Sequence, residues 1–193
     1  MSTTTTSERQ SVTDIILRTG KGSFRLPAEL KTENVWITVD NREKGDKPKW
    51  DMDPMPWEWG TLTTGDFALR DLPGCACVER KTLDDLVGCV GKSRARFERE
   101  LERMKSFRHR VVIVECDFSA LQIQSWHGRV KPASVIGSVC SWMGEVGFLF
   151  AGSQANAGDA AKRFLYSAAR HEWRRLRALA GVLEACDEGN KSD

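Results

Sequence analysis

The sequence feature that most constrains the fold is an apolar stretch that ends in three consecutive charged residues. Residues 75–78 (Cys-Ala-Cys-Val) are followed directly by Glu79, Arg80 and Lys81. In a β-strand, residues two apart point to the same face, so Glu79 and Lys81 project together and Arg80 points away. Because an unpaired charge at the end of a buried strand is costly, we expect these side chains to have partners in a site.

The rest of the pattern predicts an α/β sandwich around a mixed sheet. Val-Val-Ile-Val at 111–114 is the continuous apolar run of a central strand that is covered on both faces. Strands come first and then alternate with helices, which is the order of an α/β fold with helices flanking the sheet. We expect strands at 14–19, 23–26, 34–40, 60–69, 75–79, 110–117 and 148–151, the last of them buried. We expect helices at 82–90, 93–107, 132–143 and 159–186, the last of them long, and a loop at 44–59.

Length and composition predict a single domain. We assign residues 1–11, which are rich in Thr and Ser, to a disordered leader, 12–187 to the domain and 188–193 to a flexible tail. No apolar run approaches the roughly 20 residues of a membrane span, so we expect no membrane partner. The six scattered cysteines favour buried free thiols and an intracellular protein, cytoplasmic in a bacterium or phage, with a nuclear location left open.

Gly65 and Asp66 stand thirteen residues before Glu79, so antiparallel pairing of their strands would bring two carboxylates and the Lys81 ammonium together. Carboxylate oxygens are the ligands that Mg²⁺ prefers, and this ion borrows oxygens from substrate phosphates. The pattern therefore predicts a Mg²⁺- or Mn²⁺-dependent phosphodiester nuclease that works by metal-assisted hydrolysis. The alternative is that these acids are ordinary turn and strand-edge residues.

Positive charge is concentrated in the second helix, although the net charge of the chain is only +2. Residues 92–110 hold eight basic and three acidic residues. A helix with this excess of basic residues could contact DNA phosphates. The interspersed glutamates also fit the alternative of a solvent-exposed helix with internal ion pairs. The expected DNA contacts on this helix are Lys92, Arg94, Arg96, Arg99 and Arg103.

Three tryptophans in the predicted loop, at positions 50, 57 and 59, have two interpretations. Exposed aromatic rings stack on unpaired bases in proteins that bind single strands. Loop tryptophans also commonly pin a loop onto the core. The long final helix reaches past a compact domain, which favours a homodimer.

Four linked blocks together resemble the nuclease domain of the XPF family. They are Val39-Asp40-Asn41-Arg42-Glu43, Gly65-Asp66, Glu79-Arg80-Lys81 with Asp85, and the apolar strand that ends at Glu115. The family signature is V-D-x-R-E, then G-D, then E-R-K-x-x-x-D, and the resemblance covers roughly residues 35–175. It implies a restriction-endonuclease-like fold and a structure-selective endonuclease of DNA repair or recombination.

The resemblance implies a role for each matching residue. Asp40, Asp66 and Glu79 match metal-binding carboxylates, Glu43 is a fourth acid of the same site, and Lys81 matches the catalytic lysine.

Three further positions match supporting roles in the resemblance. Arg80 and Asp85 match residues that support the site, and we expect them to pair with each other. Arg42 would contact a DNA phosphate or hold Glu43.

Substrate choice stays open on the sequence alone. Members of the family usually carry a tandem helix-hairpin-helix module after the nuclease domain, and no such repeat stands here. Branched, flapped or junction DNA is the expected substrate. The rivals are a non-catalytic DNA-binding scaffold, which is disfavoured because every acid of the pattern is present, and a Holliday-junction resolvase or recombination exonuclease with the same chemistry.

Overall fold

The structure is a computed structural model, and it describes residues 15–19, 22–43 and 45–189. The leader and most of the tail expected from the sequence lie outside these residues. The described chain separates into two compact units, and each is described by itself. The larger unit spans residues 32–170, and the smaller one combines the described residues before 32 with those after 170.

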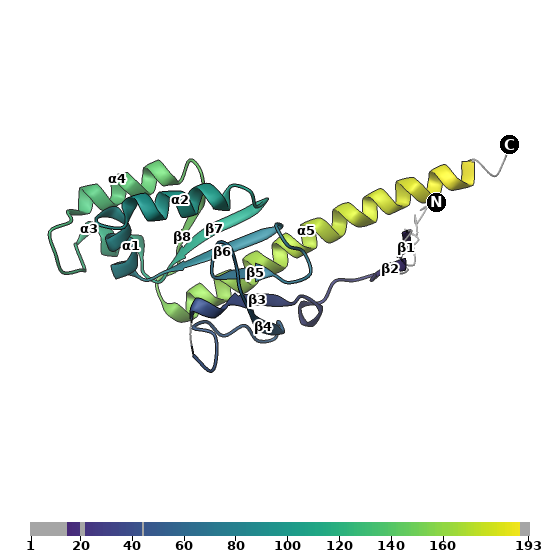
Figure 1. Cartoon of the computed structure of the whole chain (residues 1–193), viewed down its shortest axis with the longest axis horizontal. Coiled ribbons are helices and arrows are strands. Elements are labelled where there is room, and N and C mark those ends of the chain that lie inside the picture. The colour runs from purple at the N-terminus through teal and green to yellow at the C-terminus, as the bar shows by residue number, and fades with distance from the viewer. Residues whose placement is uncertain (1–14, 20–21, 44, 190–193) are drawn as a thin grey trace, which may run out of the picture. The chain divides into compact units, whose positions relative to one another are not determined.

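A six-stranded mixed sheet forms the centre of the larger unit (Figure 1). Its strand order is β4-β3-β5-β6-β7-β8. Strand β5 runs antiparallel to both of its neighbours, β3 and β6, whereas the pairs β3–β4, β6–β7 and β7–β8 are parallel. The strands are β3 (Ile37–Asp40), β4 (Trp57–Gly60), β5 (Phe67–Leu69), β6 (Ala76–Lys81), β7 (His109–Val114) and β8 (Gly147–Phe150).

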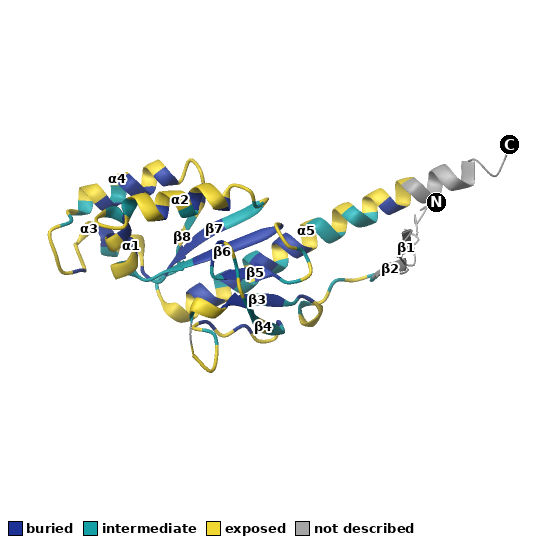
Figure 2. Ribbon diagram, viewed as in Figure 1, coloured by how far each residue is buried: buried dark blue, intermediate teal, exposed yellow. Residues whose placement is uncertain are grey.

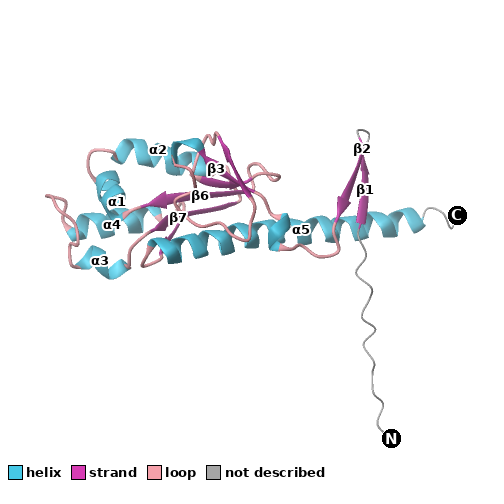
Figure 3. Ribbon diagram, turned by 90° about the horizontal axis from the view of Figure 1, so that it is seen from below, coloured by secondary structure: helices cyan, strands magenta, loops and turns pink. Residues whose placement is uncertain are grey.

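Helices cover both faces of this sheet, which confirms the expected α/β architecture (Figure 3). Four helices pack on one face, and the first part of the long helix α5 lies on the other. Short 3₁₀ turns, η1 (Thr32–Asn34) and η2 (Asn41–Glu43), flank β3. The helices are α1 (Leu83–Val90), α2 (Arg94–Met104), α3 (Phe118–Gln122), α4 (Pro132–Trp142) and α5 (Gln154–Gly189).

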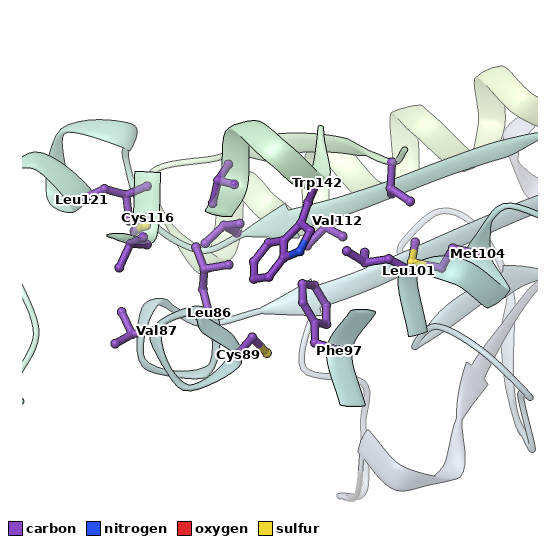
Figure 4. Close-up of a cluster of buried hydrophobic side chains, with 14 of the residues drawn as sticks. Leu86, Val87, Cys89, Phe97, Leu101, Met104, Val112, Cys116, Leu121 and Trp142 are labelled. Carbon is purple, nitrogen blue, oxygen red and sulfur yellow. The ribbon is translucent and has the colours of Figure 1, made fainter. Parts of the chain in front are cut away.

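The core between the sheet and the four helices is built from side chains at helical and strand spacing (Figure 4). Phe97, Leu101 and Met104 lie on one face of α2 and are buried, as their spacing predicts. Figure 2 shows α2 with both buried and exposed stretches, as expected for a helix that packs with one face on the sheet. The ring of Phe97 meets Trp142 of α4 edge-on, with centroids 5.0 Å apart. Val112, two residues before Val114 on the central strand β7, belongs to the same cluster. Helix α2 therefore packs onto the sheet, and its Phe97 ring contacts Lys81 of β6, the strand that carries the charged triplet.

Three strands differ from the sequence prediction. The predicted strand at 60–69 is a strand only over β5 (Phe67–Leu69), and residues 61–66 before it form a loop with bends. Strand β4 lies at the end of the predicted loop, where its tryptophans pair in parallel with β3 at the edge of the sheet. Strand β8 is half-exposed rather than buried, because it is the other edge strand and pairs only with β7. The apolar run from Phe148 to Ala151 predicts a buried strand. At the edge of a sheet, however, a strand has a neighbour on one side only, so its residues stay partly exposed to solvent.

The segment 45–56 is pinned to the core by Trp50. This side chain is 1% exposed, and its ring stacks on Phe67 with centroids 4.9 Å apart. Its indole Nε1 donates a hydrogen bond to Glu115 Oε1 at 2.7 Å. A Cβ added at Gly158 of α5 would lie only 3.1 Å from the Trp50 Cβ, so the glycine permits this close approach. Trp50 is thus part of the core, not a platform for a DNA base.

Replacing Trp50 tests this anchoring. We expect Trp50→Ala to lower the free energy of unfolding by about 3–5 kcal/mol, because it removes a buried ring and an indole hydrogen bond. Trp50→Phe keeps the ring stack and should recover more than half of that loss. Urea titrations monitored by circular dichroism measure both. The half-buried Trp57 is the matched control. A Trp50→Ala protein no less stable than Trp57→Ala would show that the segment is not anchored in this way.

The smaller unit contains a hairpin and the last part of α5. Strands β1 (Ile15–Thr19) and β2 (Gly22–Leu26) pair antiparallel. Both Trp173 and Arg177 of α5 donate hydrogen bonds to the carbonyl of Pro27, at 3.0 and 3.1 Å. Among the described residues, no helix is long and apolar enough to cross a membrane.

Candidate active site

Antiparallel pairing of β5 with β6 brings Asp66 to the strand that carries the charged triplet, as the sequence predicts. The Asp66 N–H donates to the carbonyl of Val78, the residue before Glu79, at 2.8 Å. One Asp66 carboxylate oxygen accepts from the Arg80 N–H at 2.8 Å. Gly65 makes this approach possible, because its φ is +76° and a Cβ there would lie 2.4 Å from the Cys77 sulfur.

Glu79 and Lys81 project from the same face of β6, toward the side covered by α1 and α2. Glu79 is 3% exposed and forms an ion pair with the Lys81 ammonium. That ammonium also lies over the ring of Phe97, 5.1 Å from its centroid. Burial alone would lower the pKa of Lys81, but the Glu79 carboxylate raises it overall. Lys81 is therefore a fixed cation at neutral pH.

The two carboxylates carry more negative charge than their surroundings stabilise. Burial is the main reason that the pKa of Asp66 rises to about 6 and that of Glu79 to about 8. The Asp66 carboxylate also raises the pKa of Glu79, and the carboxylates of Glu43 and Glu100 raise the pKa of Asp66. Oε2 of Glu79 is buried and has no hydrogen-bond partner among the described residues. A buried, unsatisfied carboxylate oxygen beside a second carboxylate fits a hard divalent cation, which would supply the missing positive charge.

Asp40 is engaged differently from the other two predicted metal ligands. One of its oxygens accepts from the backbone N–H and Nε of Arg42, at 2.8 and 2.6 Å. Its other oxygen accepts from Arg42 Nη2 and from the Leu62 N–H, at 3.1 and 2.8 Å. Burial alone would raise the pKa of Asp40, but these hydrogen bonds lower it. Arg42 therefore holds Asp40 rather than Glu43, and all four acceptor directions of Asp40 are used.

Arg80 is held on the opposite face of β6, but not by the residue that the sequence suggested. Its guanidinium makes two hydrogen bonds to Glu115, at 2.8 and 3.1 Å, and lies 3.6 Å from Oε2 of Glu43. The expected Arg80–Asp85 pair is wrong, because Asp85 instead bonds with Thr82, the N-cap residue of α1. Its carboxylate accepts from the Thr82 hydroxyl at 2.7 Å, and that hydroxyl accepts from the Asp85 N–H at 3.2 Å.

Helix α2 carries two kinds of basic residue. The Arg94 guanidinium contacts Ser138 at 2.7 Å and Glu98 at 2.9 Å, and Arg103 donates to the Thr64 hydroxyl at 2.9 Å. These two arginines join α2 to its neighbours. In contrast, Arg96 and Arg99 of α2 and Lys92 in the turn before it are exposed and make no ion pair within the described part of the chain, which leaves them available to phosphate.

Sequence reasoning missed two acids that influence the site residues, one on each face of β6. Glu115 was noted only as the end of an apolar strand, yet it fixes Arg80 and accepts from Trp50. Glu100 was counted among the solvated glutamates of α2, yet its side chain is only 13% exposed and raises the pKa of both Asp66 and Glu79. Its position three residues from both Phe97 and Arg103 could have indicated which face it shares.

The chain matches a family model and resembles solved structures. The model of the ERCC4 domain family matches residues 7–159. A structure of XPF from Aeropyrum pernix is 15% identical, with a TM-score of 0.56 over 78% of this chain and 73% of that chain. The structure of XPF from Aeropyrum pernix in complex with DNA is 18% identical, with a TM-score of 0.47 over 73% of this chain and 66% of that chain. No protein with a curated description matches the sequence.

Proposed function

The chain belongs to the ERCC4 domain family of structure-specific DNA endonucleases, and we propose that it hydrolyses phosphodiester bonds of branched DNA with Mg²⁺ or Mn²⁺. The observation that carries this proposal is the convergence of Asp66, Glu79 and Lys81, in which one buried Glu79 oxygen has no partner among the described residues. A site built only for stability would not place two mutually repelling carboxylates on adjacent strands.

In the proposed reaction, Asp66 and Glu79 would hold the divalent cation. Such an ion, when bound, neutralises the scissile phosphate and lowers the pKa of the attacking water. The Lys81 ammonium would donate a hydrogen bond that orients the attacking water or the phosphate oxygens. Its own position is fixed by Glu79 and by the Phe97 ring.

Two further residues would keep the metal-binding carboxylates in place. The Arg80 N–H orients the Asp66 carboxylate, and Glu115 fixes the Arg80 side chain on the far side of the strand. Asp85 would act through the start of α1, by bonding with Thr82, the N-cap of the helix that follows β6.

Cleavage of defined DNA structures tests the proposal. A labelled flap, fork, four-way junction and plain duplex are each incubated with the full chain and Mg²⁺, Mn²⁺ or EDTA. We expect cleavage of one or more branched substrates near the branch, metal dependence, and little cleavage of plain duplex. Binding without cleavage under every metal condition would instead support a DNA-binding scaffold. A four-way junction cut in preference to flaps and forks would support a resolvase, and stepwise loss of end nucleotides an exonuclease.

The exposed basic residues of α2 should supply part of the DNA affinity. We expect Arg96→Ala with Arg99→Ala to reduce the slope of log binding constant against log salt by about 2, because each phosphate contact contributes about 0.9. Arg94→Ala is the control, because Arg94 is held by Ser138 and Glu98 and should leave the slope unchanged. Fluorescence anisotropy between 50 and 200 mM salt measures the slopes. Equal slopes for the double variant and the unaltered protein would exclude these residues as phosphate contacts.

We further propose that the chain forms a homodimer through the exposed apolar side chains of α5. Leu179 and Val182 are 56% and 59% exposed, and a second copy could bury them. A molar mass in solution of twice 21.7 kDa would support this assembly, and a monomer at micromolar concentration would exclude it.

A further inference from the structure

We propose that the loop between α3 and α4, together with the turn before α2, forms a second surface that contacts DNA. This surface, the loop patch, consists of the side chains of Lys92, Arg129 and Lys131. Its ligand is the phosphate backbone of one arm of a branched DNA. The inference rests on the proposed function, because it takes DNA as the ligand, and it extends the basic surface of α2 onto a different element.

The loop at 123–131 is held in place by contacts of its own. Trp126 is buried, and its indole Nε1 donates a hydrogen bond to the carbonyl of Val130 at 3.0 Å. The side-chain amide of Gln124 donates to the carbonyl of Gly128 at 3.3 Å. A loop that is already ordered loses little conformational freedom when a ligand binds to it. The basic residues of the loop are therefore presented on a preformed surface.

Val130 places this loop against the turn between α1 and α2. A Cβ added at Gly91 would lie 3.8 Å from the Val130 Cγ2, and Val130 also packs against the core under the four helices. Figure 1 shows the loop between α3 and α4 extending beyond the helices of the larger unit. Gly91 directly precedes Lys92, and Val130 stands between Arg129 and Lys131. The three basic residues therefore flank a single contact.

The positive charge of the loop patch is not neutralised by its surroundings. Its three side chains are exposed and make no hydrogen bond or ion pair within the described residues. Residues 118–144 contain no Asp or Glu. On α1, the acids Asp84 and Asp85 lie in the first turn, at the opposite end of the helix from Gly91. A group of unpaired cations without neighbouring acids is complementary to the dense negative charge of a DNA backbone.

The loop patch lies within reach of a strand that occupies the active site. The ring of Phe97 contacts the Lys81 ammonium, and Lys92 stands five residues before Phe97. At about 1.5 Å per helical residue, this separation is on the order of 8 Å along α2. Successive phosphates of one strand are about 3.4 Å apart along a duplex. DNA bound at Lys81 therefore meets the loop patch a few nucleotides away from the site of cleavage.

The salt dependence of binding to a labelled DNA fork tests the loop patch. We expect Arg129→Ala with Lys131→Ala in the full chain to reduce the slope of log binding constant against log salt by about 2, because each phosphate contact contributes about 0.9. Raising the salt from 50 to 200 mM should then weaken the variant about tenfold less than the unaltered protein.

A control of equal charge separates a direct contact from an effect of net charge. Lys47→Ala with Lys49→Ala removes two exposed lysines from the segment that Trp50 pins to the core, and it should leave the slope unchanged. Equal reductions in both double variants would show an effect of net charge and overturn the inference. Arg129→Gln with Lys131→Gln removes the same charges with less loss of side-chain length and should reproduce the reduced slope. An unreduced slope in this glutamine variant would also overturn the inference.

Hydroxyl-radical footprinting of the same fork identifies the nucleotides that each surface covers. We expect Arg129→Ala with Lys131→Ala to lose protection of one group of nucleotides, and Arg96→Ala with Arg99→Ala to lose protection of another. Loss of the same nucleotides in both variants, or no loss in the loop variant, would contradict a separate contact surface.

The outcomes distinguish this inference from the proposed function. If the unaltered protein cleaves the fork and the loop variant binds it with an unchanged slope, the loop patch is not a contact surface and the proposed function stands. If the unaltered protein does not bind the fork at all, both the inference and the proposed function fail.

Discussion

Lys81→Met is expected to slow DNA cleavage by about 10²–10⁴-fold, because it removes the ammonium that lies beside Glu79 and Asp66, the two proposed metal ligands. The side chain is held between the Glu79 carboxylate and the Phe97 ring, so its ammonium has a defined position in the site. Metal binding at alkaline pH should be retained, since loss of a neighbouring positive charge favours a cation at Glu79 and Asp66.

Single-turnover cleavage rates and Mn²⁺ titrations at pH 8.5 measure the two halves of this prediction. Lys105→Met is the matched control, because Lys105 pairs with Glu102 and Glu145 at the end of α2 and should leave the rate unchanged. A Lys81→Met protein that cleaves within tenfold of the unaltered rate would remove Lys81 from the mechanism. Loss of Mn²⁺ binding would show that Lys81 only maintains the site.

Asp66→Asn should abolish cleavage and yet stabilise the metal-free protein at alkaline pH. The fold raises the pKa of Asp66 from 3.8 to about 6, which means that it favours the protonated carboxyl. The stability that Asp66 contributes is therefore present at acidic pH and is lost as the pH rises through about 6. Asparagine does not ionise, so the variant does not lose this stability. Its free energy of unfolding should exceed that of the unaltered protein by on the order of 1–3 kcal/mol at pH 8 and should equal it near pH 4. Its amide oxygen can still accept from the Arg80 N–H.

Urea denaturation in EDTA at pH 4 and pH 8 checks the stability of Asp66→Asn, and cleavage with Mg²⁺ checks its activity. We expect a loss of at least about 10³-fold in rate, since a direct ligand of the cation is removed. Asp71→Asn is a suitable control, because Asp71 lies on the surface of the same segment and pairs with Arg70. An Asp66→Asn protein that is less stable at pH 8 than the unaltered protein would contradict the assigned charge repulsion.

Those parts of the site that depend on local sequence could be predicted. Strand alternation placed Glu79 and Lys81 on one face, and Thr82 accepts the hydrogen bond that its position at the start of α1 predicts. Pairing of β5 with β6 brings Asp66 close to Glu79 and Lys81, through a turn in which only glycine fits at position 65.

Those parts that depend on contacts between distant residues could not be predicted. Arg80 bonds to Glu115, thirty-five positions away, because parallel pairing of β6 with β7 sets Lys81 opposite Val114. Asp40 is bonded by the Leu62 N–H, which no local pattern indicates. The sequence signature places Asp40 among the expected metal-binding carboxylates. Whether its oxygens are free to bind a metal depends on packing, which a sequence pattern does not show. The burial of Glu100 likewise depends on how α2 packs onto β6.

Cleavage of branched DNA by the full chain and by Glu79→Gln, each with Mg²⁺ and with EDTA, tests the central claim most directly. Glu79 carries the buried oxygen without a partner, and glutamine keeps the size of the side chain. The account predicts that only the unaltered protein with Mg²⁺ cleaves, while both proteins bind the DNA. Cleavage by Glu79→Gln at the unaltered rate, or cleavage that persists in EDTA, would contradict it.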